Sequence, residues 1–409
     1  MLGGPGMRVL YVNPASELGG SERSLLDLLA ALDETAPELD KSLLLFAEGE
    51  LSRRARALGI RVEIAPLPPA LGRLGESSVG GAGGLQALSL ATAALGLPRF
   101  LMALRRTVRG STPDLVHTNG MKAHLLALAA VPDLPRVVHL RDFASERPLS
   151  KTVLPLLGFR STVVTNSRAV AEDALALAPS LRTRVVYNGI NLAEFQPGLR
   201  VPERLATLAG LEPPAPDVLN VGLVATYAWW KGHRRFIAAA REVVAAEPAR
   251  SLRFYIVGGP IYRAQGSQLS VEELRRVVAD HGLERQVGLV PFQTDAAAVY
   301  RDLDIVVHAS ERPEPFGRTI VEAMATGRAV VVARAGGAAE LFVEGETALG
   351  YDPSSPSTLT GAVLRLVRDP ELRGRLGRSA RHAAESRFDR RRLGPELLAV
   401  YRELLDATH

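Results

Sequence analysis

The chain has 409 residues, more than one hydrophobic core usually holds, so two or three domains are expected. Its 47% hydrophobic and 23% charged residues are typical of a globular protein and exclude a disordered one. The absence of cysteine excludes disulfides and thiolate metal sites. With only 5% aromatic residues and no basic-aromatic strip, nucleic acid is not expected as a partner. The net charge of +5 suits anionic substrates or an anionic membrane surface.

No part of the sequence has the pattern of a membrane span or a secretory signal. The longest nearly apolar stretch, Leu85–Pro98, is shorter than the roughly 18 residues that a spanning helix needs. The first ten residues, MLGGPGMRVL, lack a basic region followed by an apolar run. We therefore expect a soluble, cytoplasmic protein.

Apolar runs of strand length alternate with helical periodicity along the first half of the chain. This alternation predicts an α/β fold in which parallel sheets carry helices on both faces. A helix is expected at about Ser21–Leu32, after a Gly19-Gly20 turn. The strands expected in this half are Met7–Asn13, Lys41–Phe46, Asp114–Thr118, Arg136–His139, Thr162–Asn166 and Arg184–Tyr187.

A proline-rich stretch at Gln196–Asp217 predicts a linker, after which the alternation restarts. We therefore expect an N-terminal domain over residues 1–200 and a C-terminal domain over residues 201–389. The helical, arginine-rich end of the chain, residues 390–409, is expected to pack back on the first domain. The strands expected in the second half are Val218–Ala225, Leu252–Val257, Val287–Pro291, Asp304–His308 and Ala329–Ala333.

Two segments of the first domain depart from this pattern. Gly72–Gly84 is too rich in glycine to pack and is expected to be a mobile loop. Over residues 97–109, Leu97, Phe100, Leu101, Leu104 and Val108 recur at helical spacing, opposite Arg99, Arg106 and Arg109. We favour an amphipathic helix that covers the first sheet. The alternative is a basic helix that touches the inner face of a membrane or a lipid acceptor.

Two short motifs at strand ends could hold phosphate. Gly19 and Gly20 would let backbone N–H groups approach an anion at a helix N-terminus, although a plain tight turn explains them equally well. Lys231, in Trp229-Trp230-Lys231-Gly232, stands just before a second helix. The helix dipole disfavours a lysine at that position unless an anion lies between the two. We favour phosphate binding over a solvated surface lysine.

The segment Glu311–Arg318, with sequence ERPEPFGR, follows a predicted strand and leads into a helix at Thr319–Thr326. Glu314 lies in the loop and Glu322 on the helix. A carboxylate accepts two hydrogen bonds, so both suit vicinal hydroxyls such as those of a sugar. Backbone N–H groups at Phe316, Gly317 and Arg318 could hold a phosphate oxygen. The alternative is that the two glutamates only complement the helix dipole.

These motifs together resemble family-4 retaining glycosyltransferases, which have the GT-B fold of two Rossmann-like domains that face a central cleft. The resemblance covers almost the whole chain, and the order and spacing of the motifs make it specific. Besides the Gly19-Gly20 turn, it rests on His117-Thr118-Asn119-Gly120, Asn166-Ser167, Val186–Ile190, Trp230-Lys231-Gly232, Val257-Gly258-Gly259 and Glu314–Glu322.

The resemblance implies a role for each motif. Glu322 would bind the donor ribose, Glu314 the hydroxyls of the transferred sugar, and Lys231 the diphosphate, assisted by amides around Phe316 and Gly317. Gly19 or Gly20 would lie against the phosphates and the acceptor. Gly258 and Gly259, with Phe292, would face the base. Asn119 and Arg141 would lie on the acceptor side. The implied reaction is front-face transfer with retention from a nucleoside-diphosphate sugar, UDP slightly preferred over GDP. No metal or other cofactor is expected, and the acceptor stays unidentified.

The sequence departs from the family pattern at two places. Thr226 stands where an arginine usually shares the diphosphate with the lysine, so Arg318 or Arg141 could supply the second charge. Many members have a histidine near Asn119, whereas this chain has His117, which is either catalytic or a buried core residue. His308 is expected to be structural. A non-catalytic nucleotide-sugar-binding relative, a sugar-nucleotide epimerase and a phosphorylase are the alternatives, although no pyridoxal lysine can be placed for the last.

Overall fold

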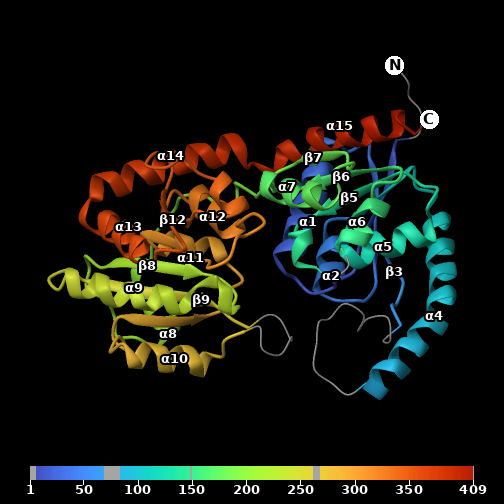
Figure 1. Ribbon diagram of the computed structural model, residues 1–409. Coiled ribbons are helices and arrows are strands. Elements are labelled where there is room, and N and C mark those ends of the chain that lie inside the picture. Colours follow the sequence, from blue (N-terminus) through green and yellow to red (C-terminus); the bar gives the residue numbers. More distant parts are fainter. Residues whose placement is uncertain (1–5, 69–82, 148–149, 261–267, 409) are drawn as a thin grey trace. The chain divides into compact units, whose positions relative to one another are not determined.

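The computed structural model describes residues 6–68, 83–147, 150–260 and 268–408, and Figure 1 shows its elements. The chain divides into two compact units. Unit 1 is Met1–Gly189 together with Arg390–His409, and unit 2 is Ile190–Asp389. Residue 200, where we expected the boundary, therefore lies inside unit 2.

Unit 1 contains one parallel sheet, in which the described residues form seven strands. The order across the sheet is β3-β2-β1-β4-β5-β6-β7, so the chain moves outward to one edge and then restarts beside β1. The bounds are β1 (Arg8–Asn13), β2 (Asp40–Leu45), β3 (Arg61–Ile64), β4 (Leu115–Asn119), β5 (Arg136–Leu140), β6 (Ser161–Thr165) and β7 (Thr183–Val185).

Helices cover both faces of this sheet because successive side chains of a strand point to opposite sides. In β1, Val9 and Tyr11 pack in a core with α1 and α15, whereas Leu10 and Val12 pack in a core with α4 and α5. The helices of unit 1 are α1 (Gly20–Thr35), α2 (Glu50–Ala57), α4 (Gly83–Gly110), α5 (Met121–Ala130), α6 (Ser150–Leu157), α7 (Arg168–Leu177) and α15 (Leu393–Asp406), with short 3₁₀ turns at Ala144–Glu146 and Arg390–Arg392.

The helix expected over residues 97–109 is part of α4 and covers the sheet. Phe100, Leu104 and Val108 are buried against strand residues such as Leu10 and Val116. The loop expected at Gly72–Gly84 lies outside the described residues up to position 82, and α4 begins at Gly83.

Unit 2 repeats the design, with six parallel strands among its described residues in the order β10-β9-β8-β11-β12-β13. The bounds are β8 (Leu219–Val224), β9 (Leu252–Gly258), β10 (Val287–Pro291), β11 (Ile305–His308), β12 (Ala329–Ala333) and β13 (Leu349–Tyr351). Its helices are α8 (Pro202–Ala209), α9 (His233–Ala246), α10 (Val271–Asp280), α11 (Ala296–Asp302), α12 (Arg318–Ala325), α13 (Ser357–Arg368) and α14 (Pro370–Arg387), with 3₁₀ turns at Trp229–Lys231 and Gly337–Glu340. Two parallel Rossmann-like sheets confirm the expected fold class.

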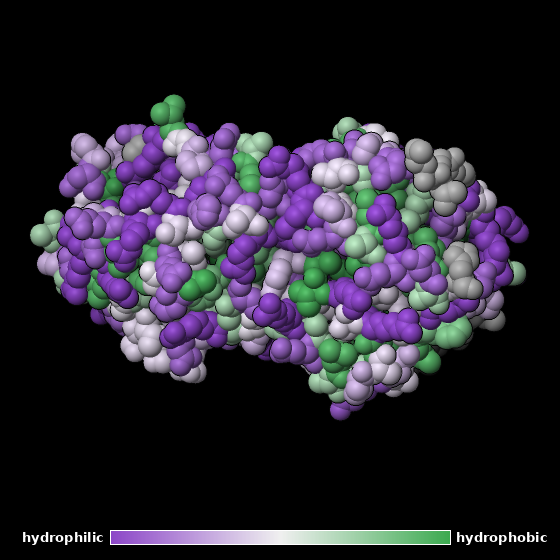
Figure 2. Space-filling view, turned by 90° about the horizontal axis from the view of Figure 1, so that it is seen from above, coloured by the Kyte–Doolittle hydropathy of each residue, from purple (hydrophilic) through white to green (hydrophobic). Residues whose placement is uncertain are grey.

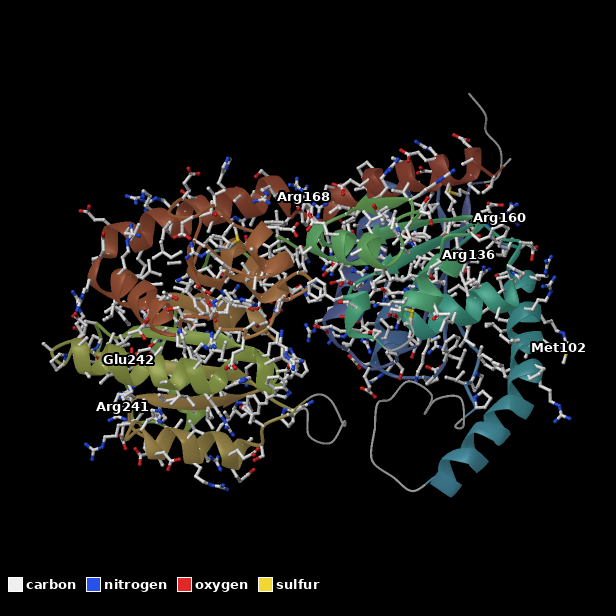
Figure 3. The ribbon with its side chains drawn as sticks, viewed as in Figure 1. Met102, Arg136, Arg160, Arg168, Arg241 and Glu242 are labelled. Atoms are coloured by element: carbon white, nitrogen blue, oxygen red, sulfur yellow. The ribbon has the colours of Figure 1, made fainter. Side chains whose placement is uncertain are left out.

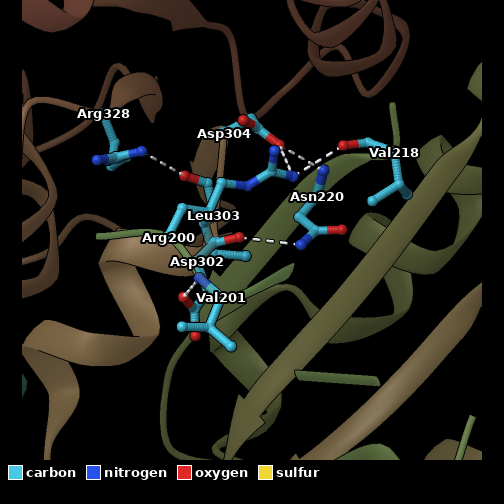
Figure 4. Close-up of polar contacts among 8 residues, drawn as sticks. All are labelled: Arg200, Val201, Val218, Asn220, Asp302, Leu303, Asp304 and Arg328. Carbon is cyan, nitrogen blue, oxygen red and sulfur yellow. Dashed lines mark hydrogen bonds and ion pairs between the residues drawn. The ribbon is translucent and has the colours of Figure 1, made fainter. Parts of the chain in front are cut away.

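The linker expected at Gln196–Asp217 is wrong in part, because this stretch contains α8 and is bonded to the sheet of unit 2. Proline 202 occupies the first turn of α8, where the missing N–H costs nothing. Just before it, Arg200 binds Asp304 at 2.8 Å, and the backbone N–H of Val201 donates to Asp302 at 2.7 Å (Figure 4). These bonds hold the segment at the amino ends of β8 and β11.

In the described part of the chain, no helix is long and apolar enough to cross a membrane. On the face drawn in Figure 2, hydrophilic residues prevail on both units, and hydrophobic residues form small separate spots.

Candidate functional site

The carboxyl ends of β8 and β11 form the point in unit 2 where the strand order reverses. Ligands of doubly wound sheets bind at such points. The 3₁₀ turn Trp229–Lys231 follows β8, and Gly232 then caps the N-terminus of α9 with a φ of 77°. A Cβ at Gly232 would lie 1.9 Å from the carbonyl oxygen of Ala309, just after β11. Only glycine therefore allows this close approach, which brings Lys231 next to the loop after β11.

Lys231 and Glu314 form the centre of the site. The ammonium of Lys231 donates to Oε1 of Glu314 at 2.7 Å, with the lysine side chain 25% exposed and the glutamate side chain 10% exposed. Ser310 Oγ donates to the same oxygen, and His308 Nε2 lies 3.0 Å from it. Burial by itself raises the pKa of Glu314, but Lys231 and His308 outweigh it and hold the pKa well below its usual range. Glu314 is therefore ionised at neutral pH.

The contacts of Glu314 leave its second carboxylate oxygen for another partner. All the hydrogen bonds that we find to this carboxylate from the described residues reach Oε1. The backbone is fixed as well, since the N–H of Gly337 donates to the Glu314 carbonyl at 2.7 Å. Oε2 can thus accept hydrogen bonds from hydroxyl groups of a ligand.

Glu322 lies on α12, the helix that follows the loop of Glu314, and is 7% exposed. Tyr300, at the end of α11, donates its hydroxyl to Oε2 at 2.9 Å. Arg318 donates Nε to Oε1 at 3.0 Å, one helical turn before the glutamate. Arg318, which we considered as a second charge for the diphosphate, is thus directed to Glu322.

The remaining expected donor residues surround the same strand ends. Thr226 follows β8 and is half-buried. A Cβ at Gly258 would lie 1.9 Å from the carbonyl of Ala225, so the end of β9 lies directly against the chain after β8. Phe292, just after β10, is 49% exposed, and Gly259 lies near it, as a Cβ there would be 3.8 Å from that of Phe292. Phe316 is buried against Phe388, and Gly317 caps the N-terminus of α12.

Unit 1 carries a second polar cluster at its own reversal point, between β1 and β4. Asn119 at the end of β4 donates to Asn13 at the end of β1 at 2.6 Å, and to Ser21 at 3.2 Å. Arg141, which follows β5, donates to Asn119 at 2.7 Å and to Asn188 at 2.6 Å. The structure thus brings Asn119 and Arg141 together, beside the turn formed by Gly19 and Gly20.

His117 is fully buried within the core of unit 1. Its Nδ1 is hydrogen-bonded to the hydroxyl of Tyr401 on α15 at 2.8 Å, and its Nε2 lies 3.1 Å from Nδ1 of His139. Burial, followed by the charge of Arg141, lowers its pKa well below the usual value. A neutral ring with both nitrogens engaged inside the unit favours the alternative of a core histidine over contact with a substrate.

Three residues that the sequence reasoning did not assign to the site contact its two glutamates. His308 was expected to be structural, yet it contacts Glu314 from the end of β11, and Ser310, two residues further along the chain, contacts the same carboxylate. That two-residue spacing was readable from the sequence. Tyr300 gave no such signal, because its contact with Glu322 depends on how α11 packs on α12. Among the described residues, no group of His, Asp and Glu side chains has an arrangement that could hold a metal ion.

Comparison with known proteins gives two family matches, in successive parts of the chain. Residues 49–194 match the glycosyltransferase family 4 model, and residues 215–383 match the model of glycosyl transferases group 1. A D-inositol 3-phosphate glycosyltransferase of Corynebacterium efficiens is 32% identical over 229 residues, 55% of this chain and 52% of that protein. Spore coat protein SA of Bacillus subtilis is 26% identical over 74% of this chain and 82% of that protein. The chain spans about half the length of the first of these relatives.

Among solved structures, Anabaena HepE in complex with UDP and glucose is similar over nearly its full length. The TM-score is 0.77 and the identity 25%, over 97% of this chain and 99% of that one. A sucrose-phosphate synthase from Thermosynechococcus elongatus has the same fold at 19% identity, with a TM-score of 0.74. The chain therefore belongs to the family-4, group 1 glycosyltransferases and has their GT-B fold.

Proposed function

We propose that the protein is a retaining, metal-independent glycosyltransferase that moves a hexose-type sugar from a nucleoside diphosphate to a hydroxyl of an acceptor. The observation that carries this proposal is the pair of Lys231 and Glu314 at the strand-order reversal of unit 2. A cation that can meet a diphosphate lies 2.7 Å from a carboxylate that can meet sugar hydroxyls. Such a pair would hold the two halves of a nucleotide sugar on either side of the bond that breaks.

In the proposed reaction, the bond between the anomeric carbon and the diphosphate oxygen breaks, and its electron pair stays on that oxygen. The acceptor oxygen forms its bond to the anomeric carbon on the same face, and its proton passes to the departing diphosphate. Lys231 stabilises the charge that grows on the leaving group. Oε2 of Glu314 accepts hydrogen bonds from hydroxyl groups of the sugar, and Glu322 accepts hydrogen bonds from hydroxyl groups of the nucleoside.

We propose UDP as the nucleotide and assign the acceptor to unit 1. HepE, at 25% identity, has been solved with UDP and with UDP and glucose, which supports a uridine donor here. Several relatives are named D-inositol 3-phosphate glycosyltransferases. An anionic acceptor would suit Arg141, whose guanidinium is bonded to two asparagines in the described cluster. D-inositol 3-phosphate is therefore the first acceptor to test.

We also propose that the protein works in the cytoplasm in glycoconjugate synthesis, in peripheral contact with the inner face of the membrane through α4. The support is the outer side of that helix, where Arg99, Met102 and Arg106 are exposed at helical spacing.

The experiment that tests the activity measures nucleoside diphosphate released from a panel of UDP-, GDP- and ADP-sugars, with and without D-inositol 3-phosphate and with excess EDTA. We expect acceptor-dependent release of UDP that EDTA does not reduce, and a product whose anomeric proton coupling in NMR shows retention. Activity lost in EDTA and restored by magnesium would contradict metal independence. Donor binding without release would identify a non-catalytic relative, and an altered sugar without acceptor would identify an epimerase.

A further inference from the structure

Glu322 is held by one neighbour on each of its two oxygens. Tyr300 donates to Oε2 at 2.9 Å, and Arg318 donates to Oε1 at 3.0 Å. All three side chains are largely buried: Tyr300 is inaccessible, and those of Arg318 and Glu322 are 13% and 9% exposed. The carboxylate therefore has little freedom to rotate.

This arrangement determines what Glu322 can still bind. An ionised carboxylate has about four lone-pair positions, two on each oxygen. Tyr300 and Arg318 take one on each side, so one acceptor position is left on each oxygen. Two adjacent hydroxyls, as in the 2′,3′-diol of a ribose, would use both, whereas a 2′-deoxyribose would leave one unused.

The two neighbours differ in how firmly they are placed. Arg318 is one turn away on the same helix, so it moves with Glu322. Tyr300 comes from α11, and its ring packs edge-on against Phe195 at a centroid distance of 6.1 Å. The tyrosine thus fixes the carboxylate relative to α11 and the segment around Phe195, as partners beyond the first contact do for metal and substrate ligands.

We propose that Tyr300 is a positioning residue that, together with Arg318, aims Glu322 at two adjacent hydroxyls, so that the site selects a ribonucleoside diphosphate over its 2′-deoxy analogue. This inference rests on the proposed function, in which unit 2 binds a nucleoside diphosphate.

Calorimetry with UDP and 2′-deoxy-UDP on the full chain tests the inference. The wild-type protein should prefer UDP by about tenfold or more, since one hydrogen bond to a charged group is lost with the deoxy ligand. Tyr300→Phe keeps the buried ring but frees the carboxylate to turn, so the preference should fall at least about threefold, mainly through weaker UDP binding. Tyr255→Phe is the matched control, because Tyr255 is equally buried in unit 2 and its hydroxyl has no hydrogen-bond partner among the described residues. Its preference should equal that of the wild type.

A merely structural role of Tyr300 would weaken both ligands equally and leave their ratio unchanged, which overturns the inference. So would a wild-type protein that binds both ligands equally. If Tyr300→Phe lowers the melting temperature so far that binding cannot be measured, Arg318→Met decides by the same ratio. A wild-type protein that binds none of UDP, GDP and ADP contradicts the proposed function itself, and the two failures are therefore distinct.

Discussion

At the scale of single residues, Lys231 has to serve two anions. Its ammonium donates to Glu314 in a largely buried pair. A diphosphate at the N-terminus of α9 would draw on the same charge, together with the helix dipole. Because an ammonium has three N–H groups, it can donate to Glu314 and to a phosphate oxygen at once. The ion pair with Glu314 therefore holds the lysine side chain in position and still leaves N–H groups for the ligand.

Replacing Lys231 should affect turnover far more than nucleoside binding. Negative charge grows on the diphosphate as the bond breaks, so Lys231→Met should lower kcat by on the order of 100–1,000-fold, similar to the loss of an oxyanion donor. Binding of uridine, which lacks phosphates, should hardly change in calorimetry. Since the substitution leaves Glu314 buried without its cation, the double variant Lys231→Met/Glu314→Gln separates folding from catalysis. It should recover stability but not turnover.

Thr226, five residues before Lys231, allows a second test of which cation meets the diphosphate. If room for the usual arginine persists after β8, Thr226→Arg should leave kcat unchanged or raise it. A Lys231→Met enzyme that keeps most of its turnover would show that another cation neutralises the diphosphate. The contact of Arg318 with Glu322 makes that residue a poor substitute.

At the scale of elements, strands and helices were predictable where burial gives a strong pattern. The buried strand β12 is a continuous apolar run, and β9 is one apart from Arg253. Their predicted bounds differ from those of the structure by at most one residue. The strands β3 and β13 were not predicted, because they have only four and three residues, and the polar-apolar alternation of β3 (RVEI) is too short to identify a strand. Pro202 contributed to the expected linker, although proline is well tolerated in the first turn of a helix. The pairing of Lys231 with Glu314 was not predictable, since it depends on the approach of Gly232 to Ala309.

The exposed side of α4 should bind anionic membranes. Met102 is 60% exposed and points away from the helix in Figure 3. Arg99 and Arg106, three residues before it and four after it, are exposed as well, and this spacing places them on the same side of the helix. Each basic residue near an anionic surface contributes about 1 kcal/mol, so Arg99→Glu/Arg106→Glu should lower binding to phosphatidylglycerol vesicles by on the order of tenfold or more. Sedimentation with vesicles measures this, and vesicles of phosphatidylcholine alone should bind weakly.

The matched control for α4 is the double reversal Arg234→Glu/Arg241→Glu on α9. It has the same seven-residue spacing, and both arginines are exposed. Equal loss of vesicle binding in the two double variants would show that only net charge matters, and would contradict a membrane-facing α4.

At the scale of the whole molecule, the chain closes unit 1 with its last helix. Leu393, Leu397 and Tyr401 of α15 pack in the core with β1 and α1. The hydroxyl of Tyr401 is hydrogen-bonded to His117 and to Tyr11, so the end of the chain is tied to the centre of the first sheet. The sequence predicted that residues 390–409 pack on this domain. It did not predict that Tyr401 would be hydrogen-bonded to a network of buried histidines. That network depends on which side of β4 and β5 faces α15.

The buried histidines should make the stability of unit 1 depend on pH above the range in which carboxylates titrate. Burial lowers the pKa of His124 to about 3 and holds the pKa values of His117 and His139 well below the usual value of 6.5. The unfolded chain therefore binds protons below pH 6.5 that the folded chain excludes, so the free energy of unfolding falls as the pH falls. For His124 alone the loss between pH 6.5 and 5.5 is about 1 kcal/mol. Denaturant unfolding at a series of pH values from 7.5 to 5 measures the slope of the free energy of unfolding against pH.

His124→Gln should lower the stability at pH 7.5, because it changes the hydrogen bond to Thr118. It should nevertheless reduce the slope near pH 5 by about 1.4 kcal/mol per pH unit. His382→Gln, at an exposed position on α14, should leave the slope as it is. An unchanged slope in His124→Gln would mean that this histidine takes up its proton in the folded protein, and that the core around Thr118 admits the charge.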